Sequence, residues 1–397
     1  MATVQFKDVS PYKLPRQHPP EDYIYGKYVQ DVTLQKTGGY NVIGIALFGV
    51  GRAGSIHLTS LVKNPRVKLL YIVDDDQSKW KPLKDYWNLT ETIFLASTNA
   101  SQVFNDENVD AVVVASPTHT HEQIVTQALD HKKAVFCEKP VAEDIEKTRK
   151  CFEKAKKVGM PLLTAFNRRF DPAYSTVRER VRKGEVGHVT TIKVCSRDSP
   201  LPTIEYLKQS GGIFHDCAVH DIDMIIWILG EYPSKVSVSA TANIPEIAEI
   251  GDHDTVAILL TFPSGTIGVI DLSRNSNYGY DQRLEVFGFK GMVRAENQQP
   301  VHGVEFSCGL EGLKRSPIFY SFPSRYQAGY INETEHFLNV LQDKEKLSVD
   351  PKDVLAVTKI ASACEEAART GRIIELNWNE EDHPQYQKEI GSIRSKL

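Results

Sequence analysis

An aspartate and a histidine four residues apart could work together as an acid–base pair. Asp216 and His220 lie within residues 210–223, where a helix would place both side chains on one face. The imidazole could take the proton of an alcohol while the carboxylate orients and stabilises it. One alternative is a helix cap beside a core histidine. Another is a metal site that adds Asp223, but a clear fourth ligand is lacking, so we expect no metal.

A lysine stands between an acid and a proline at the end of a predicted buried strand. Lys139 follows Glu138 and precedes Pro140, so it is well placed to meet a substrate or the ribose of a nicotinamide cofactor. The alternative is a surface lysine in a salt bridge. Two histidines, His119 and His121, follow another strand; they could contact a ligand or a metal, or be satisfied loop or helix-cap histidines.

A glycine turn between a strand and a helix indicates a dinucleotide site. Gly49 allows the tight turn, Gly51 lets the backbone approach a pyrophosphate, and Gly54 lets the helix pack on the strand. Free N–H groups at the helix N-terminus would face the phosphates. Asp74 ends the next strand, twenty residues past Gly54, where a carboxylate binds the ribose of NAD. The alternative is a glycine-rich turn in another α/β protein.

Alternating strands and helices must position these residues. We expect strands near 41–48, 67–73, 92–95, 110–115, 133–136 and 161–164, with helices near 53–63, 99–105, 120–130 and 142–157. This order predicts a parallel, doubly wound Rossmann sheet whose ligands bind at the carboxyl ends of the strands. Later strands near 191–197, 235–242, 255–261, 266–272 and 283–287, with helices near 218–229, 329–341 and 351–370, predict an α+β domain with a large, mostly antiparallel sheet.

Length and composition favour two soluble domains. The 397 residues divide into an extension (1–40), a Rossmann domain (41–164), a substrate-binding and oligomerisation domain (165–376) and a tail (377–397). A net charge of −4 argues against binding to nucleic acid or anionic membranes, and no apolar run reaches the ~18 residues of a membrane span. No signal or transit peptide is evident. The six scattered cysteines, among them Cys137, Cys151 and Cys195 in apolar sequence, predict buried thiols in a reducing compartment.

Five motifs in order resemble the glucose–fructose oxidoreductase/inositol dehydrogenase/MocA family, over about residues 41–376. They are Gly49-x-Gly51-Arg-x-Gly54, Asp110-Ala-Val-Val-Val-Ala-Ser-Pro-Thr-x-x-His121, Glu138-Lys-Pro140, Asn167-Arg-Arg-Phe-Asp-Pro172 and Gly211-Gly-x-x-x-Asp-x-x-x-His220. Arg197-Asp-Ser-Pro200, Tyr278-Gly-Tyr-Asp-Gln-Arg283 and Arg325-Tyr326 resemble the inositol 2-dehydrogenase branch most. The extension departs from the usual pattern, and residues 74–98 are too variable to transfer a role.

The resemblance implies an NAD-dependent enzyme that assembles as a homodimer or homotetramer through the open face of its second sheet. Its catalytic residues would be Lys139, in a bond to Pro140 that is often cis, Asp216 and His220. The candidate cofactor-binding residues are Gly49, Gly51, Arg52, Gly54, Asp74, Ser116, Pro117, His121, Glu138 and Lys139. The candidate substrate-binding residues are Asn167, Arg197 and Tyr280, with His121 beside them.

The leading hypothesis is a dehydrogenase that oxidises a ring hydroxyl of a cyclic polyol or sugar, with an inositol as the first substrate to test. His220 would take the hydroxyl proton, Asp216 would hold His220, and Lys139 would hydrogen-bond the reacting oxygen. One rival retains the cofactor and oxidises a sugar transiently, for example during glycoside cleavage. The other is a non-enzymatic NAD-binding regulator, which would tolerate loss of these three residues.

The last three residues form a targeting motif. Ser395-Lys-Leu397 matches the signal that the peroxisomal import receptor reads at a free C-terminus. Polar residues and Pro384 separate it from the last predicted helix, so the tripeptide is expected to be accessible. The sequence predicts a peroxisomal location, with the cytoplasm as the alternative if the match is coincidence.

Overall fold

The computed structural model describes residues 42–309 and 312–379. The predicted extension, most of the predicted tail and the Ser395-Lys-Leu397 motif lie outside these residues. No helix in the described part of the chain is long and apolar enough to cross a membrane.

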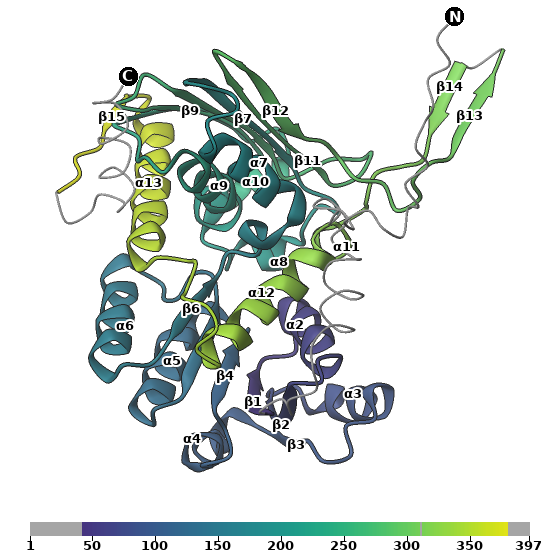
Figure 1. Cartoon of the computed structure of the whole chain (residues 1–397), viewed down its shortest axis with the longest axis vertical. Coiled ribbons are helices and arrows are strands. Elements are labelled where there is room, and N and C mark those ends of the chain that lie inside the picture. Colours follow the sequence, from purple (N-terminus) through teal and green to yellow (C-terminus); the bar gives the residue numbers. More distant parts are fainter. Residues whose placement is uncertain (1–41, 310–311, 380–397) are drawn as a thin grey trace, which may run out of the picture. The chain divides into compact units, whose positions relative to one another are not determined.

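The first sheet is parallel and has the strand order of a dinucleotide-binding fold. Its order is β3-β2-β1-β4-β5-β6, with parallel pairing throughout (Figure 1). The strands are β1 Ile43–Phe48, β2 Val67–Val73, β3 Ile93–Leu95, β4 Ala111–Val114, β5 Ala134–Glu138 and β6 Leu162–Ala165. Every residue of β1 is buried, as expected of a strand covered on both faces. The predicted Rossmann sheet is therefore confirmed.

Helices connect these strands and cover the sheet. They are α2 Arg52–Val62, α3 Trp80–Trp87, α4 Ser101–Asn105, α5 His121–Asp130 and α6 Ile145–Val158, with 3₁₀ turns η3 Gln77–Lys79, η4 Ser97–Asn99, η5 Thr118–Thr120 and η6 Asn167–Phe170. Helix α6 begins at Asp144, which accepts a hydrogen bond from Lys147 N, and ends at Gly159 in the left-handed conformation. Helix α3 had not been predicted, although its Trp80, Leu83 and Trp87 have the spacing of one helix face.

The second sheet is mixed but mostly antiparallel, as predicted. Its order is β12-β11-β7-β10-β9-β8-β15, and β7 pairs with β10 in parallel. The strands are β7 Val189–Arg197, β8 Lys235–Thr241, β9 Thr255–Thr261, β10 Ile267–Ser273, β11 Asp281–Gly288, β12 Gly291–Ala295 and β15 Ile374–Glu375. A separate hairpin pairs β13 Glu305–Cys308 with β14 Gly312–Arg315.

Helices pack on one face of this sheet and also return to the first domain. They are α7 Pro172–Arg182, α8 Ile204–Leu207, the π-helical segment η7 Phe214–Ala218, α9 Val219–Leu229, α10 Pro245–Glu249, α11 Phe322–Arg325, α12 Gln327–Leu341 and α13 Pro351–Thr370. Helices α7, α9 and α13 contact the sheet, whereas α12 packs against α2 and α13 also contacts α6 (Figure 1).

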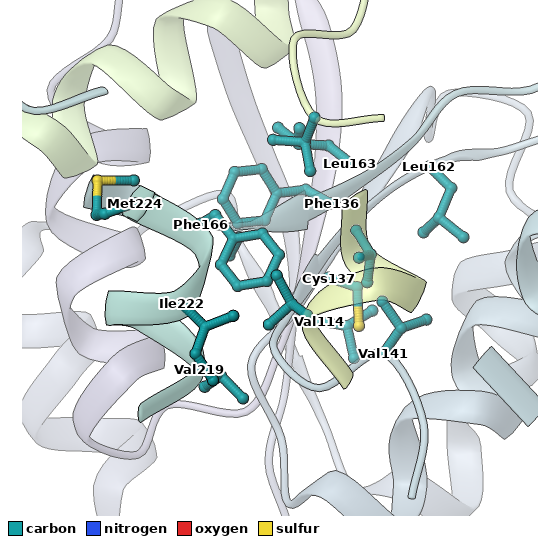
Figure 2. Packing of buried hydrophobic residues seen from close by; sticks show 14 of the residues in the cluster. Val114, Phe136, Cys137, Val141, Leu162, Leu163, Phe166, Val219, Ile222 and Met224 are labelled. Carbon is teal, nitrogen blue, oxygen red and sulfur yellow. The ribbon is translucent and has the colours of Figure 1, made fainter. Parts of the chain in front are cut away.

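One apolar core runs from the parallel sheet into the second domain. Figure 2 shows Val114 of β4 and Phe136 of β5 near Ile222 of α9, with the ring of Phe166 between these elements. All four side chains are at most 3% exposed. The same apolar core therefore supports the carboxyl ends of the parallel strands and the start of α9. The residues that follow these strand ends and begin α9 lie close together.

Candidate active site

The β1–α2 turn has the backbone that a bound pyrophosphate requires. Gly49 has φ +87°, and a Cβ there would lie 2.6 Å from Ala115 O. A Cβ on Gly54 would lie 2.0 Å from Gly49 O, so both positions exclude a side chain. Gly51 differs, because a Cβ there would meet nothing within 4 Å, and no side chain caps α2. The open side of the turn and the free N–H groups of α2 fit a dinucleotide phosphate.

Asp74 lies at the end of β2 and is tied to the glycine turn. Its Oδ2 accepts a hydrogen bond from Val50 N at 2.8 Å, and its Oδ1 accepts one from Asp76 N at 2.9 Å. Lys79 Nζ lies 3.5 Å from Asp74 Oδ1, a positive charge that the sequence analysis had not placed here. The carboxylate is thus held at the strand end where a ribose would lie.

A cavity of about 380 Å³ lies beyond the carboxyl ends of the parallel strands, between them and the second domain. It is lined by nine of the predicted site residues: Arg52, Ser116, His121, Glu138, Lys139, Asn167, Asp216, His220 and Tyr280. The three glycines, Asp74, Pro117 and Arg197 are not among its lining residues. Pro117 is exposed and precedes η5.

Asp216 is the most heavily hydrogen-bonded acid in the cavity. Its Oδ1 accepts hydrogen bonds from Tyr206 Oη at 2.9 Å and Lys139 Nζ at 3.3 Å, and its Oδ2 accepts one from Arg274 Nη1 at 3.2 Å. Lys139 Nζ also donates to Asp216 O at 2.8 Å. Burial would raise the pKa of Asp216, but the charges of Lys139 and Arg274 and the Tyr206 hydrogen bond outweigh it and lower that pKa. Asp216 is therefore an ionised anchor for Lys139.

His220 lies half-buried beside this cluster and shares no hydrogen bond with Asp216. Within the described residues its Nδ1 has no hydrogen-bond partner, and Asp216 accepts its side-chain hydrogen bonds from other groups. Burial, followed by the charges of Lys139 and Arg168, lowers the pKa of His220 well below its usual value. The imidazole is thus neutral and able to accept a proton. The expected Asp216–His220 hydrogen bond does not form where the π-helical η7 joins α9, because π turns change the angular offset between residues.

The structure does not support a metal site built from Asp216, His220 and Asp223. Arg169 holds the Asp223 carboxylate through Nη2 at 2.6 Å and Nε at 3.0 Å. No cluster of three or more histidine, cysteine or acidic side chains that could hold a metal occurs in residues 42–309 and 312–379.

Glu138 connects Lys139 to the first helix of the fold. Its Oε1 lies 2.7 Å from Nε2 of His57, which is buried in α2. Burial would raise the pKa of Glu138, but this hydrogen bond and the charges of His57 and Lys139 lower it. The Lys139–Pro140 peptide bond is cis. The strand end that carries Lys139 is therefore fixed to the helix that follows the glycine turn.

His121 and Ser116 are occupied by contacts within the chain. The two ring nitrogens of His121 lie 2.7 Å from Pro140 O and 2.8 Å from Ser116 O. The Ser116 hydroxyl lies 2.7 Å from Thr120 Oγ1. The satisfied-histidine alternative therefore describes His121 best, and His119 is exposed in the turn next to it.

The substrate candidates Asn167 and Tyr280 both line the cavity. Asn167 begins η6 and is 5% exposed, and Tyr280 precedes β11 and is 6% exposed. Arg168, which also lines the cavity, donates to Asp221 Oδ1 at 2.5 Å. Asp198 also lines the cavity, where it faces the Cys217 thiol at 3.4 Å. Arg168, Asp198 and Tyr206 had not been singled out, since no spacing in the sequence relates them to Asp216.

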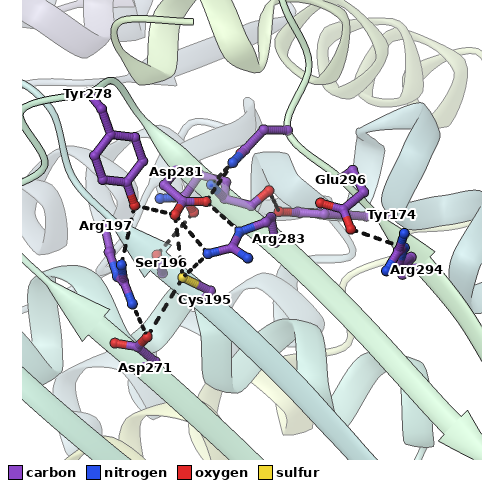
Figure 3. A network of polar contacts seen from close by, with 12 residues as sticks. Tyr174, Cys195, Ser196, Arg197, Asp271, Tyr278, Asp281, Arg283, Arg294 and Glu296 are labelled. Atoms are coloured by element: carbon purple, nitrogen blue, oxygen red, sulfur yellow. Dashed lines mark hydrogen bonds and ion pairs between the residues drawn. The ribbon is translucent and has the colours of Figure 1, made fainter. Parts of the chain in front are cut away.

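Arg197, predicted to bind substrate, does not line the cavity, so its role in substrate binding stays a prediction. Arg197 pairs with Asp271 and with Tyr278 Oη on the face of the second sheet away from the helices (Figure 3). Side chains alternate between the faces of a strand, so Arg197 and Ser196 of β7 point to opposite sides. Cys195 lies on the same face as Arg197, 3.2 Å from Arg283 Nη2, so its surroundings are polar and not apolar as expected.

Both halves of the chain match known family descriptions. Residues 43–166 match the oxidoreductase family with an NAD-binding Rossmann fold, and residues 174–294 match the GFO/IDH/MocA C-terminal domain. Inositol 2-dehydrogenase of Rhizobium meliloti is 35% identical over 84% of this chain and 99% of that protein.

Solved structures extend the similarity to the fold. A myo-inositol dehydrogenase from Corynebacterium glutamicum has a TM-score of 0.78 and 35% identity, covering 85% of this chain and all of that one. The scyllo-inositol dehydrogenase from Lactobacillus casei, solved with NAD(H) and scyllo-inositol, has a TM-score of 0.77 and 27% identity over 84% of this chain and 99% of that one. The chain therefore belongs to the glucose–fructose oxidoreductase/inositol dehydrogenase/MocA family of NAD-binding oxidoreductases.

Proposed function

We propose that this protein is an NAD-dependent dehydrogenase that oxidises a ring hydroxyl of a cyclic polyol, with an inositol as the first candidate. The observation that carries the proposal is one cavity holding a neutral, half-buried His220 and the Asp216-anchored Lys139 beside the dinucleotide turn. The substrates in the names of the relatives, myo- and scyllo-inositol, support the choice of substrate.

The side chains of the cavity divide the proton chemistry between them. When bound, NAD supplies the acceptor for the hydride that leaves the carbinol carbon. His220 takes the hydroxyl proton, because its lowered pKa keeps the imidazole unprotonated. Lys139 donates a hydrogen bond to the reacting oxygen. Asp216 keeps the ammonium in place through its carboxylate and its backbone carbonyl.

The direct test is NAD reduction across a panel of sugars and polyols. We expect oxidation of myo-inositol or scyllo-inositol, with weaker turnover of aldoses and none of acyclic polyols, because a pre-formed cavity favours a rigid ring. Lys139→Ala, in which kcat should be lowered, serves as the control. Activity on an acyclic polyol but on no ring substrate would refute the proposal, and product formation without net NADH would favour the transient-oxidation alternative.

We also propose that the protein is a homodimer or homotetramer built on the open face of the second sheet. Leu259, Ile267, Phe287 and Met292 are each 47–51% exposed there, and register pairing places Phe287 directly opposite Met292. Contiguous exposed apolar side chains favour association. Light scattering should show an oligomer for the wild type and a smaller species for Phe287→Glu. An unchanged mass would reject this interface.

We further propose that Ser395-Lys-Leu397 directs the protein to peroxisomes, with the cytoplasm as the alternative. An N-terminal fluorescent fusion in eukaryotic cells should give a punctate signal that becomes diffuse when the tripeptide is deleted. A diffuse signal from the intact chain would show that the motif is unused.

A further inference from the structure

Arg52 is held by aromatic rings of the second domain. Its guanidinium carbon lies 4.9 Å from the ring centroid of Tyr206 in α8 and 5.0 Å from that of Phe322 in α11. Contacts with ring faces leave the N–H groups at the edge of a guanidinium available. Because Arg52 begins α2 in the dinucleotide turn, those N–H groups are well placed for an anion bound at that turn.

Tyr206 connects this arginine to the proposed reaction centre. Its ring carries Arg52, and its hydroxyl donates to Asp216 Oδ1 at 2.9 Å. Partial burial of this 38% exposed side chain and the neighbouring charge of Asp216 raise the pKa of Tyr206, so the phenol stays protonated and remains a donor. The same carboxylate oxygen lies 3.3 Å from Lys139 Nζ.

We propose that Tyr206 is a positioning residue that couples cofactor binding to the Asp216–Lys139 pair. Its ring holds Arg52 for the cofactor phosphates, and its hydroxyl fixes the Asp216 carboxylate that anchors Lys139. The inference rests on the proposed dehydrogenase function for its kinetic part only, since the contact with Arg52 concerns cofactor affinity.

The two contacts of Tyr206 make separable contributions. Without the hydroxyl, Lys139 is the one side-chain donor that Asp216 Oδ1 keeps among the described residues, so the ammonium is drawn to the carboxylate and away from the reacting oxygen. Without the ring, Arg52 keeps its contact with Phe322 but is less ordered for the phosphates. The first loss changes kcat, and the second changes the affinity for NAD.

A series of variants separates these effects. Tyr206→Phe keeps the ring, so we expect kcat to fall roughly tenfold or more while the Kd for NAD, measured by calorimetry without substrate, stays within twofold. Tyr206→Leu should lower kcat similarly and also weaken NAD binding several-fold. Phe322→Leu should show the reverse balance, with a larger effect on the Kd for NAD than on kcat.

A matched control removes a phenol elsewhere. Tyr86 on α3 is 78% exposed and does not line the cavity, so Tyr86→Phe should change neither quantity. The proposal is overturned if Tyr206→Phe keeps wild-type kcat, or if Tyr206→Leu binds NAD as tightly as Tyr206→Phe. If the wild type oxidises no polyol, the proposed function is refuted. The NAD calorimetry would still test the contact between Arg52 and Tyr206, so the two failures can be told apart.

Discussion

At the scale of single residues, the cavity separates the proton acceptor from the group that binds the reacting oxygen. Burial and the charges of Lys139 and Arg168 keep His220 neutral. Three donors keep Asp216 ionised and directed towards Lys139. The charges of the cavity therefore keep His220 available as a base and Lys139 available as a hydrogen-bond donor. They do so without a hydrogen bond between Asp216 and His220.

Oxidation should slow as the pH falls through the pKa of His220, because only neutral imidazole accepts a proton. That pKa is lowered well below 6.5, so the acid limb of the pH profile of kcat should lie below about pH 6.5. His220→Ala should lower kcat by about 10²–10⁴-fold and remove this limb, with the Kd for NAD unchanged. Near-normal turnover in the variant would show that another group is the base.

Removal of Lys139 should shift that same limb. The lysine charge lowers the pKa of His220, so Lys139→Ala should raise that pKa and move the acid limb to higher pH, in addition to lowering kcat. Lys139→Arg retains the charge and should lower kcat without this movement. Identical pH profiles for the two variants would argue against an electrostatic role for Lys139 towards His220.

Residue types and motifs were sufficient to predict that Lys139, Asp216 and His220 would meet at one cavity. They were insufficient for the contacts among these residues. Tyr206 reaches Asp216 from a separate short helix, and Arg274 reaches it after complete burial in the fold. Both contacts depend on packing between distant segments, which the spacing of residues along a chain does not encode.

At the scale of elements, prediction succeeded where an apolar pattern belonged to a buried element. The continuously apolar β1 was predicted as a buried strand, whereas α3, which has apolar residues at helical spacing but no buried residue, was missed. Arg197 lies away from the cavity because a one-residue step along β7 moves a side chain to the opposite face, and its predicted role stays a prediction. The π-helical η7 has no sequence signal of its own, so the side-chain directions around Asp216 could not be deduced from the i, i+4 rule.

The end of β2 should set the cofactor preference. Asp74 can accept hydrogen bonds from ribose hydroxyls and repel a 2′-phosphate, so kcat/KM should be higher with NAD than with NADP. Asp74→Asn should reduce this ratio, and the adjacent Lys79, 3.5 Å from Asp74, should then favour the 2′-phosphate. Adding Lys79→Ala to the variant should lower the activity with NADP again. Equal kcat/KM for both cofactors in the wild type would exclude this role for Asp74.

At the scale of the whole described molecule, helix α12 ties the last third of the chain to the first domain. Arg66, 6% exposed before β2, donates to Glu335 Oε2 at 2.6 Å and to Asn339 Oδ1 at 2.7 Å in α12. These charge-assisted hydrogen bonds join two segments that are far apart in the sequence. They also hold α12 against α2, whose first residue is Arg52.

Arg66→Ala should therefore destabilise the fold by about 1–3 kcal/mol, because half-buried acceptors lose the donor that a buried arginine supplies. Lys68→Ala is the matched control, since its ion pair with Glu91 is largely exposed and should contribute little. Urea unfolding followed by tryptophan fluorescence measures both, and kcat per folded molecule should be retained. Equal midpoints for the two variants would contradict the role given to Arg66.

The apolar core shared by β4, β5 and α9 has a thermodynamic consequence. A chain with two sheets could melt in two steps, but separating the sheets here would expose Phe136, Phe166 and Ile222 to water. Scanning calorimetry of the full chain should therefore show a single cooperative heat-absorption peak. Saturating NAD, although held mostly by the first domain, should shift this entire peak to higher temperature. Two peaks, only one of which responds to NAD, would show that the two halves unfold independently.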